Sequence, residues 1–261
     1  QANLTRARMT GATFENCTMD GAIIKNTRIN NVKLQGCSIN EADLTGSKLN
    51  ELSFTQCDLS DSTLNNIQCH DCYFYRSEIQ HCEAKNSTYE KGMISFSNFL
   101  GSDLTDARFQ TTIKEDSSFS KCNLTRANFS GSTLKGQLWS QPYIRRVEAK
   151  NANFSKCRMY FVCMSKANLE NADFSNSSIE LLDAQSANLK NADFSNSNLN
   201  GLNLGHTDLT NADFSKSTIV RKLIIRDTKL EGTTFKDLNL HENPEIILEN
   251  TIYEGKSLPI E

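Results

Sequence analysis

The sequence predicts an all-β solenoid, in which short straight segments and regular corners surround a narrow apolar core. The first observation is an apolar residue at every fifth position. From Leu4 to Ile224 there are 45 such positions, here called centres, and 44 of them are apolar, with Lys114 as the exception. Because the chain is 38% hydrophobic, chance would fill only about 17 of them. The period of five therefore describes the core.

Two further observations give the shape of each repeat. Two residues before the centre, 38 of the 45 positions hold Ala, Cys, Ser, Thr, Val or Gly, which leaves room for the centre side chains. Two residues after the centre lie eight of the 12 glycines, and glycine tolerates turn conformations. A period of five fits neither a helix nor a flat strand. It fits stacked coils, in which each coil supplies backbone hydrogen bonds to the next.

The repeat has the form Ala-Asp/Asn-Leu/Phe-X-X, and in this respect the chain resembles the pentapeptide repeat family over residues 1 to about 240. The resemblance implies a right-handed quadrilateral β-helix with four pentapeptides per coil, or about 11 coils. Residues 20 apart would then stack. Good copies of the motif are residues 2–6, 42–46, 127–131, 172–176, 192–196 and 212–216, and stacking would align Phe154, Phe174, Phe194 and Phe214.

The repeat pattern sets the expected domain limits. We expect one β-helix over residues 1–240, with irregular segments near 110–118 and 137–149, and a C-terminal cap or linker over 241–261. After Ile224 the phase slips by one residue, so that Leu230 and Phe235 become the next centres. Because the chain begins with Gln, we also expect it to be part of a longer protein.

The residues that imitate catalytic or metal sites are explained by the repeat. Seven of the nine cysteines occupy the small inward position and Cys69 is a centre, so that Cys163 alone falls at an outward position. Residues 69–72 (CHDC), followed by His81, resemble a zinc site, but the period directs the cysteines inward and the histidines outward. We therefore expect no disulfide, no metal, no cofactor and no enzymatic activity within this chain.

Composition narrows the class of protein further. The net charge of −3 does not favour a general nucleic-acid binder, and no apolar run is long enough for a membrane span. Charge is banded, however: residues 131–168 carry seven Lys/Arg and one Glu, whereas residues 169–214 carry seven Asp/Glu and one Lys. We expect a cytoplasmic protein, or one secreted into a host cytoplasm as an effector.

Two clusters of large residues at outward positions are candidate binding sites for a protein partner, because exposed aromatics beside Arg are typical of binding hot spots. The alternative for each is local cover of a bulge or contact with another domain. The preferred cluster is Tyr143, Arg145, Arg146, Tyr160, Phe161 and Leu181, and the second is Tyr73, Met93 and Ile113 with Arg76 and Phe96.

Three functions are compatible with the pattern. The first is a non-enzymatic recognition or scaffold module that binds a substrate or target for a larger bacterial effector, such as a HECT-like ubiquitin ligase. This follows from the resemblance, since such effectors carry pentapeptide β-helices. The second is a DNA-mimicking gyrase-binding protein, which in this family is a strongly acidic rod. The third is a ligase whose catalytic part lies downstream of residue 261.

Overall fold

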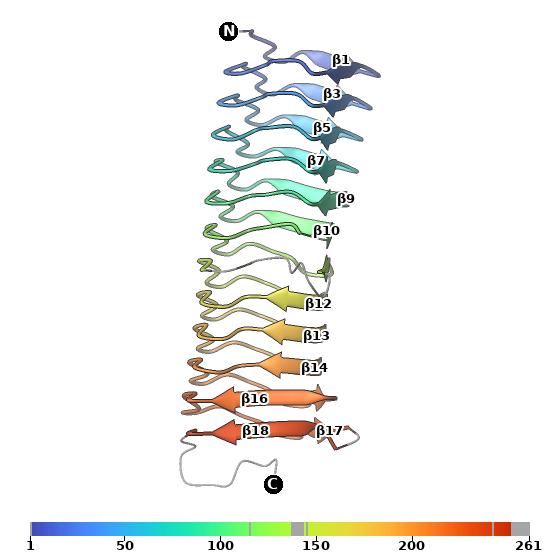
Figure 1. The fold of residues 1–261 in the computed structure, drawn as a ribbon. Helices are drawn as coiled ribbons and strands as arrows, with labels where there is room; N and C mark the ends of the chain where they lie inside the picture. Colours follow the sequence, from blue (N-terminus) through green and yellow to red (C-terminus); the bar gives the residue numbers. More distant parts are fainter. Residues whose placement is uncertain (1, 115, 137–143, 145, 242, 252–261) are drawn as a thin grey trace. The chain divides into compact units, whose positions relative to one another are not determined.

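A computed structural model describes residues 2–114, 116–136, 144, 146–241 and 243–251. Within these residues the regular structure consists of short β-strands joined by turns, and the chain divides into two compact units, Gln1–Asn128 and Phe129–Glu261. Each unit is a β-solenoid, and together they comprise about 12 turns (Figure 1). The predicted fold class is confirmed.

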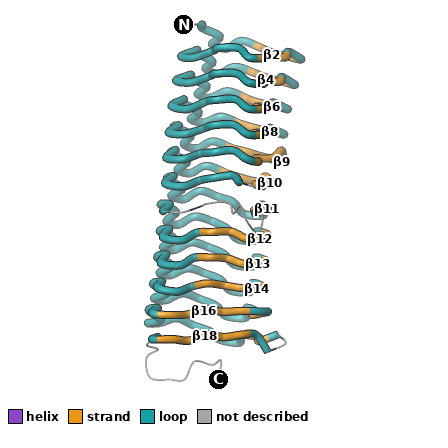
Figure 2. Tube along the Cα trace, viewed as in Figure 1, coloured by secondary structure: helices purple, strands orange, loops and turns teal. Residues whose placement is uncertain are grey.

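In the first unit, successive coils pair in parallel with a register of 20 residues. Met9 lies opposite Ile29, and Ile29 lies opposite Leu49. Most coils carry two three-residue strands separated by turns, as the alternation of strand and loop in Figure 2 shows. The strands are β1 (Arg8–Thr10), β2 (Thr13–Glu15), β3 (Arg28–Asn30), β4 (Lys33–Gln35), β5 (Lys48–Asn50), β6 (Ser53–Thr55), β7 (Gln68–His70), β8 (Tyr73–Tyr75), β9 (Thr88–Ser95) and β10 (Arg108–Lys114).

In the second unit three consecutive strands run through a corner. β12, β13 and β14 each have six residues, and Ile179 of β13 lies between Met159 and Leu199 of its neighbours. The strands are β11 (Thr133–Lys135), β12 (Arg158–Cys163), β13 (Ser178–Asp183), β14 (Asn198–Asn203), β15 (Thr218–Ile219), β16 (Lys222–Arg226), β17 (Asn239–Leu240) and β18 (Glu245–Glu249).

The residue two positions after a centre turns the chain at a corner. It adopts the left-handed conformation even where it is not glycine: φ is +52° at Asn26 and +58° at Asn171. Asn is among the residues that tolerate this conformation best, which explains its frequency there. At the corners the backbone N–H groups donate hydrogen bonds to the next coil. For example, the Asn171 N–H donates to the carbonyl of Lys190 in the following coil.

The core is a stack of centre side chains. In the second unit the rings of Phe154, Phe174, Phe194 and Phe214 stack with centroid separations of 4.7–5.0 Å, as predicted, and all four are fully buried. The stack continues to Phe129 at one end and Phe235 at the other. Shorter ring pairs fill the first unit, such as Phe99 on Phe119 at 4.9 Å.

Besides the 23-residue register between β16 and β18, where Lys222 pairs with Glu245, three departures from the 20-residue register are visible in the described residues. In β10 the register shifts between Gln110 and Thr112, so that Ile113 pairs with Ile94 and becomes buried. Near the start of the second unit, Thr133 pairs with Arg158, 25 residues on. The third lies between Ile219 and Leu223, and not after Ile224 as predicted, because Leu202 pairs with Leu223.

Candidate interaction site

An outward corner column in the second unit contains the main candidate site. Phe161 and Leu181 occupy the left-handed corner position of β12 and β13, each with φ of +56°. The residues on either side of the corner are paired: Tyr160 with Glu180, and Val162 with Leu182. The backbone turn therefore directs Phe161 and Leu181 away from the core. Leu181 is 40% exposed and Phe161 is half-buried.

Gly201 breaks this column and leaves a notch. It occupies the same corner in β14 with φ of +85° and has no side chain to continue the stack. A Cβ atom there would lie 2.5 Å from Leu181 Cδ2, so the leucine side chain leans over the glycine. The space beyond Leu181 is open because nothing at residue 201 fills it.

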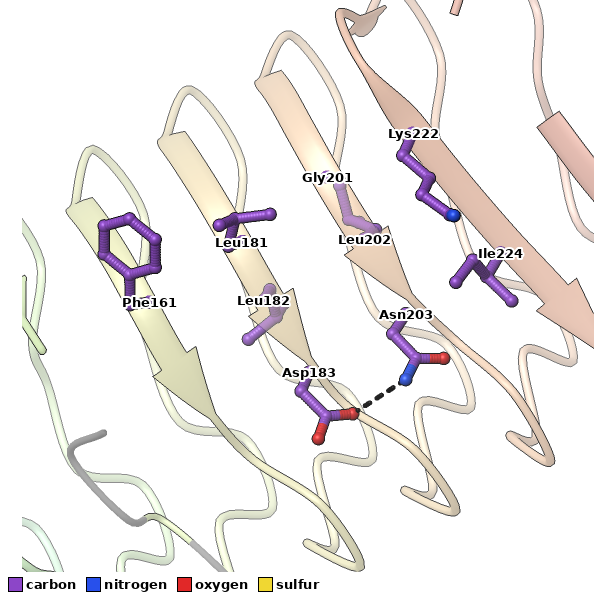
Figure 3. A pocket seen from close by; sticks show the side chains of 9 residues that line it. All are labelled: Phe161, Leu181, Leu182, Asp183, Gly201, Leu202, Asn203, Lys222 and Ile224. Atoms are coloured by element: carbon purple, nitrogen blue, oxygen red, sulfur yellow. Dashed lines mark hydrogen bonds between the residues drawn. The ribbon is translucent and has the colours of Figure 1, made fainter. Parts of the chain in front are cut away.

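The next coil closes the notch into a groove. The one-residue slip before Leu223 leaves Lys222 and Ile224 partly exposed, and Ile224 lies opposite Asn203. The groove has a volume of about 260 Å³, and Figure 3 shows its side chains on β12, β13, β14 and β16. It is lined by Phe161, Leu181, Leu182, Asp183, Gly201, Leu202, Asn203, Lys222 and Ile224.

The polar groups of the groove already have partners. Asn203 Nδ2 donates to Asp183 Oδ1 at 3.2 Å (Figure 3). The Ser165 hydroxyl donates to Asp183 Oδ2 at 3.1 Å. Lys222 Nζ lies 3.0 Å from a carboxylate oxygen of Glu245. What remains available to a ligand is apolar surface. The groove is therefore suited to binding an apolar side chain.

The structure brings together only part of the preferred cluster. Phe161 and Leu181 line the groove, whereas Tyr160 lies on β12 with the Lys135 ammonium 5.6 Å from its ring centroid. Arg146 is exposed and does not line the groove. Tyr143 and Arg145 lie outside the described residues.

The second cluster keeps its aromatic residues and loses one member. Tyr73 pairs with Met93 across β8 and β9 and is 45% exposed. The Arg76 guanidinium lies 5.7 Å from the ring centroid of Phe96, which is 37% exposed. Ile113 is 1% exposed, so its assignment to an outward position is wrong. The register shift in β10 replaces it with Thr112 opposite Met93 and takes Ile113 into the core.

Sequence reasoning missed Gly201, Lys222 and Ile224. The five-residue period predicts Ile224 as a core centre, and that prediction is wrong because the slip occurs before Leu223 and not after Ile224. A signal was present in the sequence: Leu223 and Ile225 alternate with Lys222 and Arg226, the pattern of a half-buried strand. The five-residue period concealed this two-residue period.

The cysteines and histidines do not form a site in the described part of the chain. Cys69, Cys72 and Cys82 are buried, and burial raises the pKa of the Cys82 thiol to about 12. His81 is exposed at a corner, and no group of three metal-ligating side chains occurs among the described residues. Cys163 was expected to point outward, but it is fully buried and contacts the Ser165 hydroxyl.

Comparison with known families agrees with this architecture. The sequence matches the profile described as "Pentapeptide repeat region" over residues 7–83. It also matches the profile "Pentapeptide repeats (8 copies)" over residues 102–136, 145–177 and 183–220, so that together the matches cover well over half of the chain. The chain belongs to the pentapeptide repeat family. No curated protein matches this pentapeptide repeat chain.

The solved structures that match this chain include several pentapeptide repeat proteins. HetL, which is involved in heterocyst differentiation regulation in the cyanobacterium Nostoc sp. strain PCC 7120, is 19% identical with a TM-score of 0.31; the match covers 98% of this chain and 91% of HetL. QnrB1, a plasmid-mediated fluoroquinolone resistance protein, is 15% identical with a TM-score of 0.34, covering 90% and 92%. The A-module of the mannuronan C-5 epimerase AlgE4 from Azotobacter vinelandii is 10% identical with a TM-score of 0.36, covering 98% and 90%.

Hydropathy adds one finding. In the described residues, the structure contains no helix with the length and apolar character needed to cross a membrane.

Proposed function

We propose that this pentapeptide repeat chain is a non-enzymatic recognition module that binds a partner protein through the groove lined by Phe161, Leu181 and Ile224. The supporting observation is apolar side chains at outward positions where the repeat places polar residues elsewhere. Leu181 is one of four large hydrophobic residues counted as exposed in the described residues, and it lies at the edge of the groove.

The size of the groove indicates what it accepts. About 260 Å³ accommodates one large apolar side chain of a partner, and anchoring by a few buried side chains is typical of protein interfaces. We further propose that the bound partner is a target protein, which the module presents to a larger effector such as a HECT-like ligase. The alternative role is that of a DNA-mimicking gyrase-binding protein.

Site-specific photocrosslinking tests where a partner binds. A photoreactive amino acid at position 181 should give a crosslinked adduct with a defined protein, and the same group at position 73 should not. With that protein purified, the double variant Phe161→Ala/Leu181→Ala should weaken binding by roughly 2 kcal/mol or more, because hot-spot residues carry most of the binding energy. Calorimetric titration measures this change.

The control is Tyr73→Ala/Phe96→Ala, which removes two exposed aromatic side chains from the first unit. It should leave the affinity unchanged, and both double variants should keep the wild-type melting temperature within a few degrees. Equal loss of affinity in both variants would contradict the proposed site. Inhibition of gyrase supercoiling by the wild-type chain would instead favour the alternative role.

A further inference from the structure

A column of positive charge runs along one face of the first unit. Arg8, Arg28 and Lys48 lie opposite one another in the parallel pairs β1–β3 and β3–β5, and all three side chains are exposed. Segments 6–10, 26–30 and 46–50, which form this face in the three coils, contain no Asp or Glu. Among the described residues no ion pair neutralises any of the three. We call this column the basic ladder.

A column of negative charge runs along one face of the second unit. Asp173 lies opposite Asp193, and Asp193 lies opposite Asp213. In each residue Oδ1 accepts the backbone N–H of the serine two positions on, at 2.7–2.8 Å. No cation pairs with these three carboxylates among the described residues. We call this column the acidic ladder.

Other aspartates at the same repeat position show that such a carboxylate is accessible to a cation. In Asp43 and Asp103, Oδ1 likewise accepts the backbone N–H two residues on. Their Oδ2 atoms are paired with Lys25 at 2.7 Å and with Lys85 at 3.2 Å. Oδ2 of each residue in the acidic ladder is therefore in a position to accept a lysine or arginine from outside.

Elsewhere in both units, charged residues opposite one another in neighbouring coils are often of opposite sign. Arg126 contacts Asp106 at 2.7 Å, and Lys150 contacts Glu170 at 2.9 Å. Each ladder places three like charges in a row, which is destabilising in a sheet, and like charges also lie opposite one another in the bridges Asp58–Glu78 and Glu83–Asp103. An external ladder of opposite charge would remove this repulsion in each.

We propose that the protein self-associates, with the basic ladder of one copy lying along the acidic ladder of a second copy. Both ladders repeat once per coil, at the ~4.8 Å separation of neighbouring strands, so three ion pairs form without loss of register. Each ladder lies within one unit, and the match therefore follows from the coil repeat alone.

The spacing distinguishes a second copy from an extended acidic peptide. Side chains on one face of a strand recur about every 6.6 Å, so over two intervals such a peptide falls out of step with the ladder by about 3.6 Å. A second copy stays in step over any number of coils.

Sedimentation velocity of the full chain tests the proposal. Association should be concentration-dependent in about 0.01 M salt, where the Debye length is ~30 Å, and should weaken strongly at 0.15 M, where it is ~8 Å. Arg28→Glu should lower the association constant by roughly tenfold or more, because it places two negative charges face to face. Asp193→Arg should do the same through the other ladder.

The double variant Arg28→Glu/Asp193→Arg is the decisive sample, because it restores the middle ion pair with reversed polarity and should restore association. Lys33→Glu, an equal charge change on a neighbouring face of the first unit, should associate like the wild type. Arg28→Gln and Asp193→Asn repeat the test without charge reversal and keep the fold if the larger changes do not. An absence of association at low salt, or a double variant no better than the single ones, would overturn the proposal.

Discussion

At the residue scale, the position within the five-residue repeat determines the environment of a side chain. Phe174 is a centre and is enclosed between Phe154 and Phe194 at 5.0 and 4.7 Å. Ser177, at the small inward position, donates its hydroxyl hydrogen to the Phe154 carbonyl of the preceding coil at 2.9 Å. A buried polar group is tolerated there because its hydrogen bond is made.

The first prediction concerns the centre of the phenylalanine stack. Phe174→Ala should lower the free energy of unfolding by about 3–5 kcal/mol, because it removes ring contacts on both sides and leaves a cavity. Phe174→Asp should cost more, since it buries an unpaired charge. Urea unfolding followed by circular dichroism measures both. Phe96→Ala, at an exposed ring, should change stability by no more than about 0.5 kcal/mol, and a comparable loss in this control would contradict the argument.

At the element scale, the corner of β9 shows how the conformation of one residue and the close approach of two coils together determine where a strand can turn. β9 runs for eight residues because Lys91 and Gly92 both adopt positive φ, which carries the strand around the corner from the Tyr89 face to the Ile94 face. A Cβ atom on Gly92 would collide with the Cys72 carbonyl oxygen of the coil before. Glycine is therefore required here for the close approach as well as for its φ of +60°.

The second prediction tests this requirement. Gly92→Ala should destabilise the chain by several kcal/mol, because the backbone of the preceding coil cannot move away without breaking its strand pairing. Gly131→Ala is the matched control: it has φ of +76° but nothing within 4 Å of the added Cβ. The control should show only the cost of the left-handed conformation, roughly 1–2 kcal/mol. Thermal melting of both variants decides the matter, and equal losses would show that φ alone explains the glycine.

The elements also show which features of the fold can be predicted from the sequence. The five-residue period predicts which side chains are buried, as at Phe154 and Phe214, because any other arrangement would expose the whole apolar set. It indicates an irregularity near residues 110–118 and a one-residue slip after Ile224, but it does not give the exact position of either. A one-residue change costs little where apolar residues stand on both sides, as at Ile113. The groove exists because of the slip, and so only Phe161 and Leu181 of its apolar rim were found from the sequence.

At the scale of the whole molecule, one turn interaction is repeated many times. An aspartate just before a centre accepts the backbone N–H two residues on, for example Asp43 from Thr45, Asp103 from Thr105 and Asp208 from Thr210, at 3.0–3.1 Å. Burial raises the pKa of Asp103, but hydrogen bonds from Thr105 and Lys85 outweigh burial and hold the pKa below its usual value. The same balance lowers the pKa of Asp208.

The third prediction follows from these lowered pKa values. A carboxyl whose pKa is lower in the folded state contributes stability that is present above its unfolded pKa, near 3.9, and is lost as the pH falls through the folded pKa. The contribution of these carboxyl groups to the free energy of unfolding should therefore be constant between pH 7 and pH 5. It should decrease when the pH is lowered further, below about pH 4. Urea titrations at pH 7, 5 and 3 measure the trend.

The variant Asp103→Asn isolates the contribution of charge, because the amide oxygen can still accept the Thr105 N–H. At pH 7 it should be less stable than the wild type by up to about 1 kcal/mol, the range for partly exposed ion pairs. As the pH falls through the folded pKa, the difference should shrink toward zero. A difference that persists unchanged at low pH would show that the charge of Asp103 is not its cause.

The parallel stacking of the coils also determines how each unit responds to force. Hydrogen bonds such as Asp193 N–H to the Ala172 carbonyl run from one coil to the next, so a pull on the end of a unit loads the last coil first. That coil detaches before its neighbour bears the strain, and 20 residues release about 70 Å of extended chain. Each unit therefore unfolds under tension one coil at a time, in steps of nearly constant length. The force needed is far below the force that shears two strands past each other.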